Sequence, residues 1–134
     1  MNDARWVLAS VDRDAVFADV ASIQRDGDSV RMRSLLVLKE DFLLGGAPTW
    51  GGSRQWTFDC RTGTADLHLF VFLMGDGSYG QGTLDRNPPY VPAENRDEAA
   101  LLAVACDPAS AGEADADNLA DAVRVGRAAL RLAD

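Results

Sequence analysis

The fold is decided by residues 54–60, Arg-Gln-Trp-Thr-Phe-Asp-Cys, and by residues 65–74, Ala-Asp-Leu-His-Leu-Phe-Val-Phe-Leu-Met. In the first segment Trp56, Phe58 and Cys60 alternate with polar residues, which is the period-two pattern of a strand with one buried face. The second segment is apolar on both faces, and one of these faces carries Leu67, Leu69, Val71 and Leu73. A strand of this kind is predicted to be central in its sheet.

The flanking sequence predicts further strands joined by short turns. Apolar runs at 6–11 and 15–20 surround Asp12-Arg13-Asp14 and predict a hairpin. The sequence Asp26-Gly27-Asp28 predicts a turn, because glycine adopts a positive φ without strain, and a long strand at 30–38 should follow it.

One further strand and one long loop complete the predicted β-region. Residues 79–84 predict a sixth, weaker strand. Residues 45–53 contain four glycines and one proline, and we expect a loop there, because these residues weaken both ladders and helices.

The pattern becomes helical near residue 95. Asn95 and Glu98 have the spacing of a capping box, residues 99–106 are rich in helix formers, and Pro108 ends the run. A second amphipathic helix is predicted at about 113–133, with a narrow stripe of Ala116, Leu119, Val123, Gly126 and Leu130. Strands followed by helices predict an α+β fold: an antiparallel sheet of about six strands with the helices on one face.

The predicted organisation is one domain at 1–111 with an added C-terminal helix at 112–134. We expect this helix to dock on the same domain, which favours a monomer, and a dimer through the helix is the alternative. The predicted core consists of Trp56, Phe58, Leu67, Leu69, Val71, Leu73, Leu101, Leu102 and Leu119.

Composition excludes several classes of partner. The chain has 134 residues and a net charge of −8, from 21 acidic and 13 basic residues. It lacks the clustered Lys and Arg with which proteins neutralise nucleic acid or anionic membrane surfaces, so neither is an expected partner. No apolar run approaches the ~20 residues of a membrane-spanning helix. No signal peptide is visible, which predicts either a cytosolic protein or a mature domain that has lost its leader.

The two cysteines, Cys60 and Cys106, end a predicted strand and a predicted helix that should cover it. This placement is compatible with a disulfide, and it is equally compatible with two buried free thiols in a cytosolic protein. A catalytic thiol is not expected, because the single histidine lies elsewhere in the sequence.

Residues 75–80, Gly-Asp-Gly-Ser-Tyr-Gly, match the G-x-G-x-x-G spacing of nucleotide-binding loops. Such a loop must open a helix whose N-terminus faces the phosphates. Here Thr83-Leu84 and Pro88-Pro89 follow, so we interpret the segment as a hairpin loop and expect no nucleotide cofactor.

Two acidic patterns have the residue types of a catalytic or metal site. Asp66 and His68 share a strand face, but no nucleophile elbow accompanies them, so we expect a half-exposed strand pair and not a catalytic triad. The Asp12/Asp14 and Asp26/Asp28 pairs have no third ligand at calcium-loop spacing, and we interpret them as turn residues. We therefore predict no catalytic residue, no metal and no cofactor.

Trp50 lies in the glycine-rich segment, where few neighbours are available to bury it. Exposed aromatic residues are effective binding anchors, so Trp50 is a candidate contact for a ligand or partner. The alternative, which we favour, is that its ring folds back over the sheet edge.

From about Arg5 to Asp107 the chain resembles the surface-adhesin E-like family of small Gram-negative envelope proteins. The resemblance rests on the order and spacing of Trp6-Val7, Val16-Phe17-Ala18-Asp19, Ser22-Ile23-Gln24-Arg25-Asp26-Gly27, Val30–Leu38, Asp59-Cys60, Gly80, Gly82, Val91-Pro92 and Glu98–Cys106. The chain departs from the family at Tyr90, where a Trp is usual, in the added helix and in the missing leader.

The resemblance implies an exported domain in which Cys60 and Cys106 form a disulfide that ties a helix to the sheet. Together with the absence of a catalytic motif, it leads us to expect a non-catalytic binding domain of the periplasm or cell surface, adhesin-like by the family's name, with a protein as the candidate partner. The alternatives are a cytoplasmic interaction or immunity-type protein and, last, a small enzyme. No ligand contact carries over from the family onto a residue of this chain.

Overall fold

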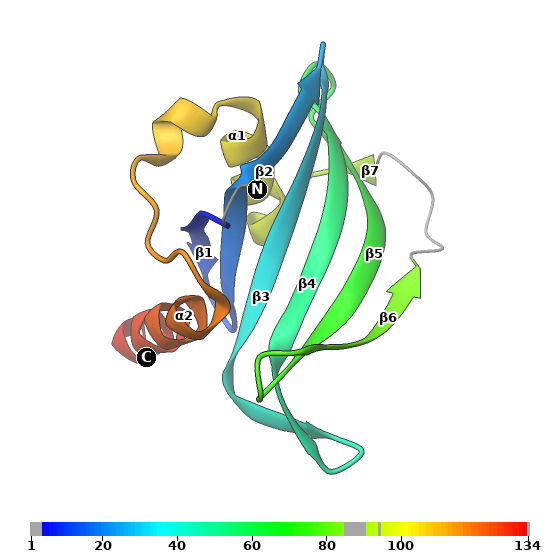
Figure 1. Cartoon of the computed structure of the whole chain (residues 1–134). Coiled ribbons are helices and arrows are strands. Elements are labelled where there is room, and N and C mark those ends of the chain that lie inside the picture. Colours follow the sequence, from blue (N-terminus) through cyan, green and yellow to red (C-terminus); the bar gives the residue numbers. More distant parts are fainter. Residues whose placement is uncertain (1–3, 85–90, 94, 134) are drawn as a thin grey trace.

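A computed structural model describes residues 4–84, 91–93 and 95–133 (Figure 1). Tyr90, Pro88 and Pro89 lie outside the described residues. The strands are β1 Trp6–Val11, β2 Ala15–Asp26, β3 Ser29–Leu44, β4 Ala47–Asp59, β5 Thr64–Met74, β6 Tyr79–Leu84 and β7 Val91–Pro92. The helices are α1 Arg96–Cys106, the 3-10 turn η1 Pro108–Ala111, and α2 Leu119–Ala133.

The sheet is an antiparallel meander in which β1 to β6 lie side by side in chain order, and the short β7 pairs with β5. The predicted α+β class, with six antiparallel strands and two helices, is confirmed. The hairpin at Asp12–Asp14 and the turn after Asp26 are also confirmed, and Gly27 there has φ 63°. The predicted G-x-G-x-x-G hairpin loop joins β5 to β6.

The prediction of a loop at 45–53 is wrong, because β4 begins at Ala47 and runs through the glycines. Only Gly45 and Gly46 form the turn, with φ 57° and 86°. Gly51 and Gly52 are buried, and an added Cβ would overlap the carbonyl oxygen of Leu36 or the ring of Phe70. These two glycines therefore permit close approach inside the sheet, a use of glycine that composition alone does not reveal.

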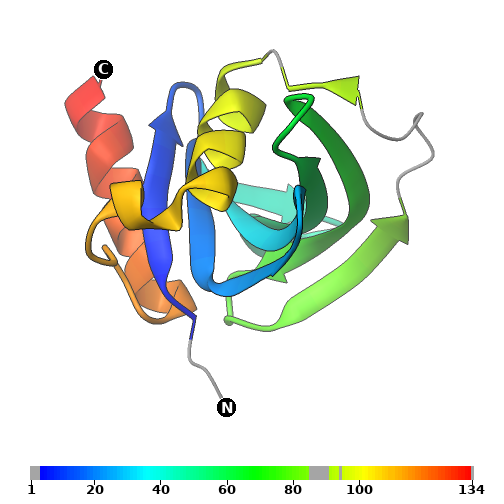
Figure 2. The ribbon, with the colours of Figure 1, turned by 90° about the horizontal axis from the view of Figure 1, so that it is seen from above.

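The two helices pack on opposite faces of the sheet, which corrects the prediction of one covered face. Figure 2 shows β1 between them. On the α1 face, Leu101, Val104 and Ala105 pack with Val16, Ala18, Val30, Met32, Trp56, Phe58 and Ala65. On the α2 face, Ala122, Val123 and Leu130 pack with Trp6, Ala15, Phe17, Leu35, Val37 and Leu73. Strands β2 and β3 thus contribute alternate residues to two cores, as period-two geometry requires.

Helix α1 begins as predicted, with the side chain of Asn95 accepting a hydrogen bond from the Glu98 N–H at 2.8 Å. At its other end a disulfide joins Cys106 to Cys60, with Cα atoms 5.7 Å apart. The disulfide implied by the family resemblance is confirmed.

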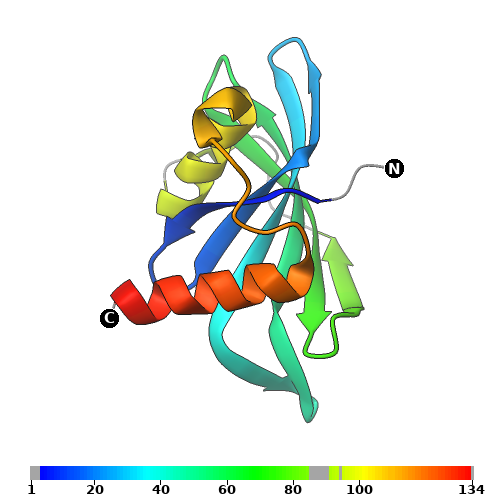
Figure 3. The same ribbon diagram turned by 60° about the vertical axis from the view of Figure 1, so that its left-hand side comes forward.

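Helix α2 starts at Leu119, later than the predicted residue 113, and Figure 3 shows it lying across the strands. Ala116 is not on the helix, because its backbone bonds to β1: the Trp6 N–H donates to the Ala116 carbonyl at 2.8 Å. This bridge covers part of the outer edge of β1. At Gly126 the helix backbone lies so close to the sheet that an added Cβ would be 3.0 Å from the Phe17 ring.

The predicted core is partly wrong on β5. Leu73 is fully buried, but Leu67, Leu69 and Val71 are only partly buried. Gln55 pairs with Leu69 and Trp56 with Leu67, so His68 is an extra residue that forms a bulge. A bulge exchanges the faces of the residues beyond it, which strict alternation cannot anticipate. Leu102 and Leu119 are also partly buried, while Trp6, Phe17, Leu35 and Val37 are core residues that the prediction missed.

Candidate functional site

Helix α2 covers only part of its face of the sheet, and a polar hollow of about 680 Å³ lies beyond it. We call this hollow the polar groove. It is lined by Ser22, Gln24, Ser29, Arg31, Met32, Arg33, Gln55, Trp56, Thr57 and His68. Two arginines, one histidine and no carboxylate are among these residues. One weak feature of the sequence points to the polar groove: Arg31 and Arg33 alternate with apolar residues at the start of a strand.

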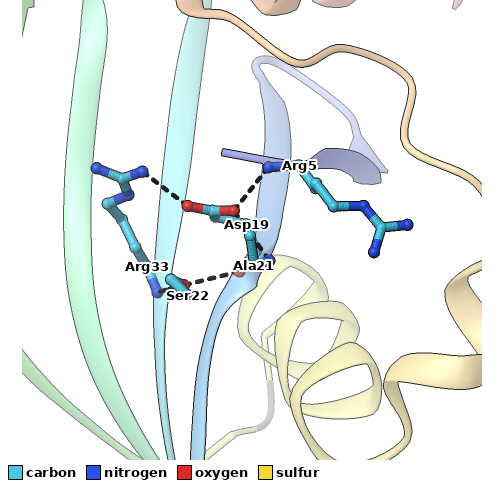
Figure 4. Close-up of polar contacts among 5 residues, drawn as sticks. All are labelled: Arg5, Asp19, Ala21, Ser22 and Arg33. Atoms are coloured by element: carbon cyan, nitrogen blue, oxygen red, sulfur yellow. Dashed lines mark hydrogen bonds and ion pairs between the residues drawn. The ribbon is translucent and has the colours of Figure 1, made fainter. Parts of the chain in front are cut away.

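Arg33 is fixed by the buried carboxylate of Asp19 on the neighbouring strand (Figure 4). Its Nη2 lies 2.7 Å from Asp19 Oδ2, and the Asp19 side chain is 2% exposed against 34% for Arg33. Asp19 Oδ1 also accepts backbone hydrogen bonds from Arg5 at 2.9 Å and Ala21 at 3.1 Å. The guanidinium of Arg33 lies over the Trp6 ring, 5.0 Å from its centroid. Asp19 therefore joins β2 and β3 to the residue that precedes β1, and it compensates the charge of Arg33.

A bulge in β2 shapes the neighbouring wall of the polar groove. Regular pairing with β3 stops after Asp19 and resumes at Gln24. Inside the bulge Ser22 Oγ accepts the Arg33 N–H at 2.8 Å and donates to the Asp19 carbonyl at 2.7 Å. The serine hydroxyl thus replaces the missing ladder partner of Arg33. No glycine or proline marks this bulge, so the sequence predicts an uninterrupted strand there.

Arg31 lines the polar groove between its cross-strand neighbours, Gln24 on β2 and Thr57 on β4. Its side chain is exposed, and it has no ion-pair or hydrogen-bond partner among the residues that the structure describes. Gln55 is the cross-strand neighbour of Arg33 and is likewise exposed. The groove therefore has one uncompensated cation with amide side chains around it.

The β5 bulge directs His68 toward Thr57 at one end of the polar groove. His68 Nε2 lies 2.6 Å from Thr57 Oγ1, and its Nδ1 lies 3.6 Å from Asp66 Oδ2. The side chain of His68 is 47% exposed and that of Asp66 is 15% exposed, so the predicted half-exposed strand pair is confirmed. Thr57, which sequence reasoning missed, is 6% exposed. This series of carboxylate, imidazole and hydroxyl orients the ring, but the threonine hydroxyl is too enclosed for ready attack on a substrate.

A second, smaller hollow of about 400 Å³ lies at the start of α1. Its lining mixes charges, with Arg54 and Arg96 beside Asp12, Asp97 and Glu98. Burial raises the pKa of the nearby Asp14 carboxyl, and the carboxylate of Asp97 raises it further. Opposite charges already compensate one another here, so this hollow is a weaker candidate than the polar groove.

The residues singled out from the sequence do not gather at one site. The Cys60–Cys106 disulfide packs with the α1 core, away from the polar groove. Trp50 is partly buried against the α2 core and approaches the β5–β6 turn at Gly75 and Gly77. In that turn Asp76 Oδ1 accepts hydrogen bonds from the Ser78 hydroxyl and N–H, which lower the pKa of Asp76. The packing of Trp50 on the α2 core and on the β5–β6 turn shows that its ring folds back over the sheet. A binding role for Trp50 stays a prediction.

No family model matches this chain, and neither a curated protein nor a solved structure matches it. Within the described ranges, no group of His, Cys, Asp or Glu side chains is arranged to hold a metal ion. None of the helices in those ranges has the length and apolar character needed to cross a membrane.

Proposed function

We propose that this chain is a non-catalytic binding domain of the bacterial cell envelope that holds its ligand in the polar groove. The observation that carries the proposal is the groove itself, a hollow of ligand-sized volume lined by hydrogen-bond donors on rigid strands. Sites built on strands hold their donors in fixed positions, which favours selective binding.

The Cys60–Cys106 disulfide supports the exported location. Disulfides persist in oxidising compartments such as the periplasm and cell surface, and they are rare in the cytosol. The bond also joins the two positions that the surface-adhesin E-like resemblance pairs, which supports membership of that family. A cytoplasmic interaction or immunity-type protein is the alternative, and a small enzyme ranks last because Thr57 is enclosed.

We also propose that the domain acts as a monomer with a protein as its partner. The apolar stripe of α2 is buried on its own sheet through Val123, Gly126 and Leu130, which leaves little of it for a second copy. Trp50 remains the candidate aromatic contact for a partner.

The binding proposal is tested by an amide NMR screen of the full, disulfide-bonded chain against neutral sugars, small acids, amino acids and short peptides. Ligands should shift amide signals of residues 22–24, 29–33, 55–57 and 68. Shifts confined to other parts of the chain would contradict a site in the polar groove. Export is tested by expressing the chain with and without a secretion leader and titrating thiols. The exported form should show no free thiol and the cytosolic form two.

A further inference from the structure

The polar groove differs in charge from the rest of the molecule. The chain has eight more acidic than basic residues, yet the groove lining contains Arg31, Arg33 and His68 and no Asp or Glu. A hollow without carboxylates in so acidic a protein disfavours cationic ligands, because they would find no partner for their charge. It is suited to a ligand that brings its own negative charge.

The two arginines are not equivalent. Asp19 already compensates Arg33, which is held by this ion pair and by stacking on Trp6. Arg31 has no such partner in the described part of the chain, and its side chain is exposed in the groove. The attraction for an anion therefore comes mainly from Arg31.

We propose that the polar groove binds a small anionic molecule whose carboxylate or phosphate group pairs with the guanidinium of Arg31. This inference rests on the proposed function. The planar guanidinium donates two parallel hydrogen bonds to either group. Gln24 is the exposed cross-strand neighbour of Arg31, and the exposed Gln55 lies one residue pair further along, so their amide groups can bind the polar remainder of the ligand. The volume of about 680 Å³ exceeds that of a bare ion and fits a molecule of drug-like size.

Thr57 and His68 bound the groove next to Arg31. Their hydrogen bond of 2.6 Å and the carboxylate of Asp66 beyond Nδ1 hold the imidazole at the rim. Asp66 is not part of the groove lining, so its negative charge does not stand between Arg31 and an incoming anion.

The test is an amide NMR titration of the full oxidised chain at low ionic strength with three probes: inorganic phosphate, glutarate and the neutral sugar maltose. Phosphate, glutarate or both should shift amides near residues 24, 31, 55 and 57. The probe that binds more tightly identifies the group as phosphate or carboxylate. Arg31→Gln should weaken this binding about tenfold or more, as expected for loss of a charge-assisted hydrogen-bonded pair.

The matched control is Arg131→Gln, which removes the same charge from the exposed last turn of α2 and should leave the affinity unchanged. Well-dispersed spectra of both variants establish that they are folded. Equal weakening in the two variants would overturn the inference, because the binding would then be unspecific. If maltose alone shifts the groove amides, the anionic ligand class is wrong and the proposed binding function stands. If all shifts fall outside the groove, the proposed function fails as well.

Discussion

Asp19 on β2 and Arg33 on β3 form an ion pair of 2.7 Å in which the carboxylate is almost completely buried. The same carboxylate accepts the N–H groups of Ala21 on β2 and of Arg5, just before β1. A buried charge is stable only when it is paired and hydrogen-bonded, and Asp19 meets both conditions. This pair fixes the wall of the polar groove beside Arg31.

Asp19→Asn should lower the free energy of unfolding by about 1–3 kcal/mol, since it removes the partner of a partly buried guanidinium. The loss stays below that of a fully buried pair because Arg33 reaches solvent. Urea titration measures the change. Arg124→Gln breaks the exposed pair with Asp121 and should cost less than about 0.5 kcal/mol. Similar losses in the two variants would show that burial does not strengthen the Asp19 pair.

Replacing Cys60 and Cys106 by serine together should destabilise the fold by about 4 kcal/mol. The reason is that the bond closes a loop of 46 residues and restricts the unfolded chain. Thermal unfolding of the oxidised protein, the reduced protein and the double variant measures this effect. The reduced protein and the variant should agree. A reduced protein as stable as the oxidised one would mean that α1 holds its place by packing alone.

Gly52→Ala should destabilise the protein by about 1–3 kcal/mol, because the new methyl group would overlap the Phe70 ring between two paired strands. Gly82→Ala on the exposed edge strand β6 is the control. There the added carbon meets the Val71 methyl at 3.3 Å, and the open surface lets the chain adjust, so the loss should be smaller. Chemical denaturation compares the two. A harmless Gly52→Ala would contradict the close approach of β4 and β5.

Most of the sheet was predictable because period-two alternation and the Asp-Gly turn are local signals. The failures came where a contact between distant residues decides the structure. Gly51 and Gly52 resemble loop residues until the backbone of Leu36 and the ring of Phe70 are seen beside them. The extra residue His68 exchanges faces along β5 without any local mark in the sequence.

The candidate site was less predictable than the fold. Arg31 and Arg33 were recognisable as residues on the solvent-facing side of a strand, but their setting depends on three strands meeting. Thr57 looked like an ordinary outward residue of an alternating strand. Only the register that places it opposite Asp66 and near His68 reveals its hydrogen bond. The exposure of these residues also depends on which face of the sheet α2 covers, and how much of it. The amphipathic pattern of a helix does not specify that face.

Asp14→Asn should stabilise the protein at neutral pH by less than about 1 kcal/mol. Burial and then Asp97 raise the pKa of Asp14, so the folded state binds a proton more readily than the unfolded chain does. The wild type therefore loses stability as the pH rises from the ordinary carboxyl value of 3.8 through the raised pKa. The advantage of the variant should vanish below that window. Thermal melts of the wild type and of Asp14→Asn across this pH range measure the difference, and a difference that stays constant with pH would contradict a raised pKa of Asp14.

Gly126→Ala tests the docking of α2 on the sheet by the sign of its effect. In a free helix, alanine is more stable than glycine by about 1 kcal/mol. In the folded chain the new carbon would lie 3.0 Å from the buried Phe17 ring and 3.1 Å from the Ala15 methyl, so we expect a net loss of about 1 kcal/mol. Ala128→Gly, at a partly exposed position of the helix, reports the ordinary preference with a loss of about 0.5–1 kcal/mol. Light scattering should give a monomer throughout. A gain in stability with Gly126→Ala would mean that α2 does not pack on Phe17 in solution, and a dimer through this helix would then replace the monomer.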